Sequence, residues 1–375
     1  MDKIKVLWVA NALGYGGAEK QLLYMYDILK NSPQYDITVL YYAHMKDELN
    51  LDGVKTVYID KKTIGPIKTI RQIRKYIKEN DIKIVHALGG SSANVYGRFG
   101  AALRKGVVPI GAMLGKKHFV SWKMKLVNSL LNMFGNWWTV NNLDLIPILK
   151  KDLCFVNDKK IVMVHNGFVP ADKVNYHKNE ETEYDLAKGE DFVFGVVGRV
   201  EPVKNYPLFL RAAKEVLSEF PHTKFWVIGN GKSYDDLVAL AKELEIDDSV
   251  KFWGFRDDVD AALARMDVFV QTSFTEGSPN TVAEAMRASL PVITTNSTDF
   301  SEMIIDGKNG YVTESDNLDQ LVSAMKKMLS LSKDELKACG RVSNELFMNT
   351  FLDSKVKDEY KMLYEKVLIG GKKDA

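Results

Sequence analysis

Short apolar runs alternate with amphipathic segments in two successive series, and this alternation is the feature that most limits how the chain can fold. The first series contains predicted strands at 3–10, 35–42, 55–59 and 82–86 and a predicted helix at 67–79. The second contains predicted strands at 192–199, 224–229, 250–254 and 264–273. Strands that alternate with helices form parallel sheets whose two faces are covered by those helices. The sequence therefore predicts an α/β protein with two doubly wound parallel sheets.

The boundaries between the predicted domains follow from where apolar periodicity is lost. A chain of 375 residues is long enough for two domains. Residues 174–190 are rich in Asn, Glu, Lys and Thr and show little periodicity, so we interpret them as a linker. This divides the chain into a first domain at 1–173, a second at 191–353 and a closing segment at 354–375 that contains a predicted helix.

Charge is distributed unevenly between the two halves of the chain. Residues 1–175 hold 26 Lys and Arg against 14 Asp and Glu, whereas the remaining residues hold 25 against 35. The amino half is therefore expected to attract an anionic partner, such as a lipid headgroup surface or a phosphorylated acceptor. Nucleic acid is disfavoured, because no RNA- or DNA-binding module surrounds the basic and aromatic residues.

Cysteine usage and hydropathy indicate the compartment. Cys154 and Cys339 lie far apart in apolar periodic segments and are expected to be buried free thiols. No apolar stretch is long enough to span a bilayer, and the first ten residues suit a strand better than a signal peptide. We therefore expect a cytoplasmic protein, which peripheral binding would hold at the inner face of the cell membrane.

The most informative stretch of the second series places a strand, a loop and a helix in succession. The apolar run 264–273 predicts a buried strand that delivers Glu276 at its carboxyl end. After the turn at 277–280, the segment 281–288 predicts a side-chain-capped helix that carries Glu284. A helix N-terminus binds anions, and carboxylates accept hydrogen bonds from hydroxyl groups. Hydroxyl groups on either side of a phosphate are typical of a nucleotide sugar.

Two other loops carry groups that suit phosphate. Arg199 and Lys204 follow the strand 192–199, where such cations can neutralise a diphosphate, although two basic residues on a loop are more often simply solvated. The turn at 11–19 is rich in glycine, which lets the backbone approach a ligand closely. It lacks both the dinucleotide fingerprint and a P-loop, which argues against an NAD-dependent epimerase or dehydrogenase.

Together these pieces resemble the signature of the retaining glycosyltransferases of family 4. The resemblance is carried by Glu276 and Glu284 with seven residues between them, by Gly-Gly-Ala-Glu at 16–19, and by Arg199 and Lys204. It implies the GT-B fold, in which two Rossmann-like domains face each other across a cleft and a terminal helix packs back on the first domain. It also implies catalytic roles for Arg199, Lys204 and Glu276, with Glu284 on the ribose diol. The implied donor-binding residues are Gly16, Gly17, Arg199, Lys204, Phe255, Glu276, Ser278, Asn280, Thr281, Val282 and Glu284.

The resemblance implies a reaction as well as a fold. A hexose or N-acetylhexosamine would pass from a nucleoside diphosphate sugar, with UDP as the expected nucleotide, to a hydroxyl group of a glycan or lipid-linked acceptor. The anomeric configuration would be retained, as in cell-surface polysaccharide biosynthesis, with neither cofactor nor metal. The alternative is a non-catalytic protein that binds nucleotide sugars or glycans on a transferase scaffold.

The acceptor side departs from the family pattern. Leu114 stands where many members carry a histidine, and His118 is the nearest replacement. Beyond it, Trp122 and Lys123 open a segment that mixes lysines with aromatic residues. Two interpretations remain open: an interfacial helix on anionic lipid, or an ordinary amphipathic helix that packs its aromatic residues into the domain.

One further motif suggests a metal site. Asp258-Val259-Asp260 spells the Asp-X-Asp metal motif of a different glycosyltransferase fold. Acidic residues also favour the first turn of a helix, and this simpler interpretation is preferred here.

Overall fold

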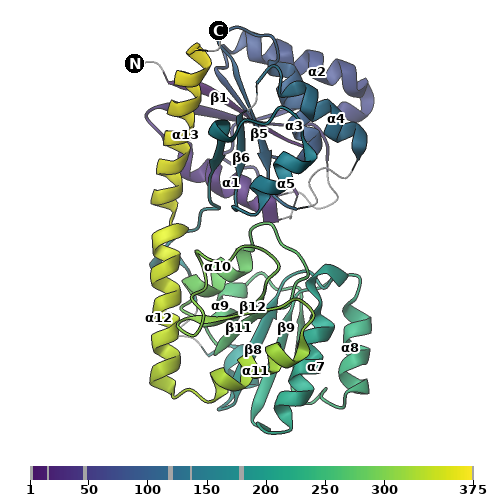
Figure 1. Ribbon diagram of the computed structural model, residues 1–375, viewed down its shortest axis with the longest axis vertical. Coiled ribbons are helices and arrows are strands. Elements are labelled where there is room, and N and C mark those ends of the chain that lie inside the picture. The colour runs from purple at the N-terminus through teal and green to yellow at the C-terminus, as the bar shows by residue number, and fades with distance from the viewer. Residues whose placement is uncertain are drawn as a thin grey trace. The chain divides into compact units, whose positions relative to one another are not determined.

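The computed structural model describes residues 3–14, 17–44, 49–116, 121–135, 137–176 and 181–373. The chain forms two compact units, each with one parallel sheet (Figure 1). Unit 1 combines Met1–Phe168 with Asp353–Ala375, and unit 2 is Val169–Leu352. In both sheets helices lie between most of the successive strands, as the sequence predicts.

The sheet of unit 1 has the strand order β3-β2-β1-β4-β5-β6-β7, and all its neighbouring pairs are parallel. The order reverses between β1 and β4, which creates the type of switch point where doubly wound sheets bind ligands. The elements are β1 Ile4–Ala10, α1 Gly17–Leu29, β2 Tyr35–Tyr41, β3 Thr56–Tyr58, α2 Lys61–Glu79, β4 Ile84–Ala87, α3 Gly90–Ala101, β5 Val108–Met113, α4 Trp122–Leu131, β6 Trp137–Val140, α5 Leu145–Asp152, β7 Ile161–Met163 and α13 Asp353–Lys373.

Helix α13 belongs to unit 1 and contributes to its core (Figure 1). It is amphipathic, and its buried side chains pack with α1 and one face of the sheet; they are Val356, Tyr360, Leu363, Tyr364 and Val367. Helices α2 and α3 pack on the other face. The terminal helix therefore completes the apolar core of the unit that contains the start of the chain.

The sheet of unit 2 has the order β10-β9-β8-β11-β12-β13 and is also parallel, with its switch point between β8 and β11. Helices α7, α8 and α11 pack on one face. The elements are α6 Glu183–Lys188, β8 Phe192–Val197, α7 Tyr206–Leu217, β9 Thr223–Ile228, α8 Tyr234–Glu243, β10 Val250–Gly254, α9 Val259–Leu263, β11 Val268–Gln271, α10 Asn280–Arg287, β12 Val292–Thr295, β13 Gly310–Thr313, α11 Leu318–Leu329 and α12 Lys333–Thr350.

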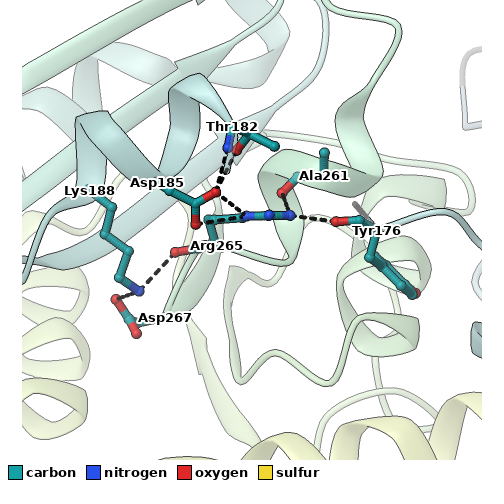
Figure 2. A network of polar contacts seen from close by, with 7 residues as sticks. All are labelled: Tyr176, Thr182, Asp185, Lys188, Ala261, Arg265 and Asp267. Atoms are coloured by element: carbon teal, nitrogen blue, oxygen red, sulfur yellow. Dashed lines mark hydrogen bonds and ion pairs between the residues drawn. The ribbon is translucent and has the colours of Figure 1, made fainter. Parts of the chain in front are cut away.

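Residues 174–190, interpreted above as a linker, contain helix α6 and lie inside unit 2. Tyr184 of α6 is fully buried, with its ring centroid 4.5 Å from that of Trp253. A polar network fixes the same segment (Figure 2). The buried Arg265 guanidinium contacts both oxygens of Asp185 at 3.1 Å and donates to the carbonyl of Tyr176. A six-residue helix shows too little apolar periodicity to be recognised from the sequence alone.

We expect Asp185→Ala to lower the free energy of unfolding by roughly 1–3 kcal/mol, because it leaves the Arg265 guanidinium without its carboxylate. Chemical denaturation would measure the loss. Glu190→Ala is the matched control, since Glu190 is exposed close to α6 and should change stability by less than about 0.5 kcal/mol. Equal effects of the two variants would show that the network in Figure 2 does not hold α6 in place.

The prediction of two buried thiols is wrong for one cysteine. Cys154 is exposed and Cys339 is partly buried, and both are free thiols. Cys154 follows the end of α5, so the helical spacing that suggested burial stops before it. None of the helices in the described ranges is both long and apolar enough to cross a membrane.

Candidate active site

The predicted catalytic residues of unit 2 lie on the two loops that flank its switch point. The loop after β8 holds Arg199 and a short 3₁₀ helix, Pro202–Lys204. The loop after β11 holds Glu276 and leads into α10. Because β8 and β11 are neighbouring parallel strands, their carboxyl ends deliver both loops to the same edge of the sheet.

Lys204 and Glu276 form an ion pair at this edge. Lys204 Nζ lies 2.7 Å from Glu276 Oε1, and both side chains are largely buried, with exposed fractions of 20% and 15%. The hydroxyl group of Ser273 donates to the same oxygen at 2.6 Å. Oε1 thus accepts two hydrogen bonds from this unit. Ser273 was not among the predicted site residues, although it stands three residues before Glu276 among the small polar residues that close the strand.

Backbone contacts fix the position of both charged residues. Asn205 adopts a left-handed conformation with φ of 49°, which ends the 3₁₀ helix and starts α7. Thr272 donates from Oγ1 to the carbonyl oxygen of Lys204 at 2.8 Å. The backbone N–H of Glu276 donates to the carbonyl of Ser297 at 3.1 Å. The loops after β8, β11 and β12 are therefore joined, and the charged pair stands on a rigid base.

Arg199 and Glu284 complete the predicted set in different ways. Arg199 is exposed, and within the described ranges it makes no ion pair. It follows Gly198, whose φ of 146° is a conformation that L residues rarely adopt. Glu284 lies in the second turn of α10 and is partly buried. The structure thus brings Lys204 into contact with Glu276, places Arg199 on the same loop as Lys204, and puts Glu284 on the helix that follows Glu276.

The start of α10 differs from the prediction. The helix begins at Asn280 behind Pro279, and no side chain caps it. The N–H of Val282 donates to the carbonyl of Pro279 at 3.1 Å, and its side chain is fully buried. Its role in donor binding stays a prediction, and the structure shows that its N–H is bonded within this turn and that its side chain belongs to the core. Ser278 and Thr281, also predicted to bind the donor, are partly buried beside it.

The predicted base neighbour and the Asp-X-Asp motif lie together after β10. Phe255 is 71% exposed behind Gly254, so its ring is accessible to a ligand. Asp258 receives two hydrogen bonds of 2.9 Å from Arg256, and this guanidinium holds the pKa of Asp258 below its usual value. Asp260 is paired with Arg287 at 2.7 Å. Both carboxylates of the motif are therefore engaged in ion pairs within unit 2.

Unit 1 contains a cavity at its own switch point. A volume of about 330 Å³ opens at the carboxyl ends of β1, β4 and β5, beside the first turn of α1. Leu114 lines it, so the position where the resemblance places a histidine supplies an apolar side chain. Glu19 supplies a carboxylate, and Gly17 is the first residue of α1. Gly16 and His118, which were predicted to contact donor and acceptor, lie outside the described residues.

Helix α4 exposes an apolar stripe in unit 1. The large side chains at its surface recur at helical spacing and continue into the following turn; they are Trp122, Leu126, Leu130, Met133 and Phe134. Trp122 is 69% exposed, and Lys123 Nζ lies 5.8 Å from the centre of its ring. The opposite side of α4 is held to α3 by Arg98, which donates to Asn132 at 2.6 Å. The aromatic residue at the start of α4 therefore faces outward instead of packing into the domain.

Two family models match most of the chain. The model described as "Glycosyl transferases group 1" matches residues 178–343, within unit 2 and its helices. The model described as "Glycosyl transferase 4-like" matches residues 23–128, within unit 1. The two matches fall on separate units, in agreement with the division seen in the structure.

Individual relatives and solved structures are also similar to this chain. The Escherichia coli "UDP-Gal:alpha-D-GlcNAc-diphosphoundecaprenol alpha-1,3-galactosyltransferase" is 27% identical over 345 residues, which cover 86% of this chain and 87% of the relative. The Campylobacter jejuni "N-acetylgalactosamine-N,N'-diacetylbacillosaminyl-diphospho-undecaprenol 4-alpha-N-acetylgalactosaminyltransferase" is 28% identical over 55% of this chain and 59% of its own length. The crystal structure of Anabaena Alr3699/HepE in complex with UDP superposes with a TM-score of 0.83, covering 97% of this chain and 100% of that one, at 18% identity.

Proposed function

Because the chain belongs to the family 4 glycosyltransferases and has their GT-B fold, we propose that it transfers a sugar from a UDP-sugar to a hydroxyl group of a lipid-linked or glycan acceptor. The sugar is a hexose or N-acetylhexosamine, and its anomeric configuration is retained. Support for a lipid-linked acceptor comes from the two relatives whose names contain a diphosphoundecaprenol acceptor. Support for UDP comes from the E. coli relative's donor and from the UDP complex of the Anabaena structure.

The observation that carries this proposal is the Lys204–Glu276 pair at the switch point of unit 2. The reacting bond of a nucleotide sugar joins a diphosphate to a polyhydroxylated ring. The cation of Lys204 suits the diphosphate, and the carboxylate of Glu276 suits the hydroxyl groups of the ring. Negative charge builds on the leaving phosphate in the transition state, where fixed cations stabilise it most. Lys204 and Arg199 supply that charge in the proposed mechanism, with the N–H groups of Asn280 and Thr281 at the start of α10.

The carboxylates have the complementary task. Glu276 accepts hydrogen bonds from hydroxyl groups of the donor sugar and so fixes its orientation, while Glu284 accepts from the ribose diol. Ser278 helps to shape the sugar pocket, and Phe255 lies against the base. In this mechanism the donor phosphate itself takes the proton of the acceptor hydroxyl, so no general base of the protein is required. Since side chains neutralise the diphosphate, neither a metal nor a cofactor is needed.

The second candidate is a non-catalytic protein that binds nucleotide sugars or glycans. The intact Lys204–Glu276 pair argues against a decayed site and so favours an enzyme. Incubation of the purified protein with radiolabelled UDP-sugars and polyprenyl-diphosphate-linked monosaccharides separates the two. We expect a disaccharide product of retained anomeric configuration, seen by NMR, and unchanged rates with a metal chelator. Binding of UDP-sugars without transfer or hydrolysis would favour the second candidate.

We further propose that unit 1 binds the surface of an anionic membrane through the apolar stripe on α4. Its exposed Trp122, Leu126 and Leu130 and the neighbouring Lys123 suit the interface between lipid headgroups and acyl chains. The excess of basic residues in the amino half adds attraction to anionic lipid. Such binding would keep the protein at the inner face of the cell membrane, near lipid-linked acceptors.

Trp122→Ala combined with Leu126→Ala should weaken co-sedimentation with anionic vesicles by about 10-fold or more, because each side chain loses burial of roughly 1.5–3 kcal/mol. Leu186→Ala is the matched control: Leu186 is 73% exposed on unit 2 and should not change vesicle binding. Wild-type protein that does not bind vesicles containing phosphatidylglycerol would rule out the membrane surface.

A further inference from the structure

Oε1 of Glu276 accepts hydrogen bonds from two donors, and a third hydroxyl group lies near one of those donors. Lys204 Nζ and Ser273 Oγ both donate to Oε1, at 2.7 and 2.6 Å. Ser273 is fully buried at the end of β11, and its own carbonyl accepts a 2.6 Å hydrogen bond from Thr295 Oγ1 on β12. The serine therefore has little freedom to move, and it reaches the carboxylate from the floor of the site.

The third group is the hydroxyl of Tyr206, the first residue of α7. The side chain is 3% exposed, and its hydroxyl has no hydrogen-bond partner among the described residues. Both this hydroxyl and Lys204 Nζ lie close to Gly198, at 3.1 and 3.8 Å from the point where a Cβ on that glycine would stand. Burial raises the pKa of Tyr206, and the nearby Glu276 carboxylate raises it further. A buried hydroxyl without a partner is costly, so this arrangement calls for an explanation.

The proposed reaction explains why the Tyr206 hydroxyl is kept without a partner. When the donor binds, its diphosphate competes with Glu276 for the charge of Lys204. A carboxylate that is largely buried loses stability and orientation if one of its two donors leaves. Yet this is the moment at which Glu276 must hold the hydroxyl groups of the sugar. A second donor that is idle before binding and available after it would solve the problem.

We propose that Ser273 and Tyr206 are positioning residues that hold the Glu276 carboxylate when Lys204 turns to the donor diphosphate. Ser273 holds Oε1 throughout, and the Tyr206 hydroxyl donates to the carboxylate only after Lys204 has moved. This inference rests on the proposed function, because it assigns Lys204 to the diphosphate. It adds two residues to the site that neither touch the donor nor follow from the family signature.

Steady-state kinetics test the first half. We expect Ser273→Ala to lower kcat roughly 10-fold to 100-fold, since a misplaced group at the reacting sugar costs up to about 10²-fold, and Tyr206→Phe to lower it about 3-fold to 10-fold. The KM for the UDP-sugar should change less than kcat in both. Thr294→Val is the matched control: Thr294 is equally buried on β12, but its hydroxyl donates to Gln271 and should leave kcat unchanged. Wild-type kcat in Ser273→Ala would overturn the proposal for Ser273.

A thermal-unfolding cycle without any donor tests the second half. In the wild-type background, Tyr206→Phe should leave the unfolding temperature unchanged or raise it, because it removes an unpartnered hydroxyl. In the Lys204→Met background, where Tyr206 is free to bond Glu276, the same substitution should lower it by roughly 3–6 °C. Equal effects in the two backgrounds would overturn the role of Tyr206. Since this cycle needs no turnover, it judges the inference even if the protein proves not to be a transferase, and wild-type transfer judges the proposed function alone.

Discussion

Replacing Lys204 with methionine is expected to lower the turnover of sugar transfer by at least about 10²-fold to 10³-fold, the typical cost of removing one group that stabilises transition-state charge. Methionine keeps much of the length of the side chain and removes its charge together with its hydrogen-bond donors. The substitution also leaves the Glu276 carboxylate without its ion-pair partner, although Ser273 still donates to it. The fall should therefore appear mainly in kcat, with the fold retained.

The measurement is the initial rate of product formation, together with thermal unfolding to show that unit 2 is intact. Lys214→Met is the matched control, because Lys214 lies on α7 of the same unit, is 45% exposed on its side chain and only approaches Glu245 at 3.9 Å. Its turnover should stay within about twofold of wild type. If Lys204→Met kept full turnover, the central claim about how the leaving diphosphate is stabilised would be lost.

The alternation of strands and helices was enough to predict two parallel sheets. Both the periodicity of an amphipathic helix and the apolar run of a buried strand can be recognised from neighbouring residues. The same local evidence placed Lys204 and Glu276 at the carboxyl ends of strands. It could not show that they touch, since 72 residues separate them and only the pairing of β8 with β11 brings them together.

The misses have a common cause in contacts between distant segments. Helix α6 is recognisable from the burial of Tyr184 against Trp253 and from the Asp185–Arg265 contact, which join segments more than 60 residues apart. The bond from the N–H of Val282 to Pro279 was also not foreseeable, because a sequence shows where a helix starts but not which of its N–H groups are already bonded. The role of Tyr206 depends on its hydroxyl group and Lys204 both lying close to Gly198, which no local pattern reveals.

A buried histidine of unit 1 should make the stability of the protein depend on pH. His86 is fully buried at the end of β4, where it contacts Thr139 Oγ1 through Nε2 at 2.9 Å and Tyr364 Oη through Nδ1 at 3.3 Å. Tyr364 Oη accepts a 2.7 Å hydrogen bond from Trp8, so its own O–H is oriented to donate to the imidazole. This arrangement suits a neutral ring, and burial lowers the pKa of His86 from 6.5 to about 3.

The sign of the effect follows from linkage. Between pH 6.5 and about 3 the unfolded chain binds a proton at His86 that the folded chain does not, so the stability that this histidine contributes is complete above 6.5 and is lost as the pH falls through that window. We expect the free energy of unfolding to be lower at about pH 4.5 than at about pH 7 by roughly 2–3 kcal/mol from this group. Urea denaturation of wild type and His86→Gln at both pH values isolates the contribution of His86, because the carboxylates titrate alike in the two proteins. The variant should lack this part of the pH dependence, and identical pH dependence in both would mean that His86 binds a proton as readily in the folded unit as in the unfolded chain.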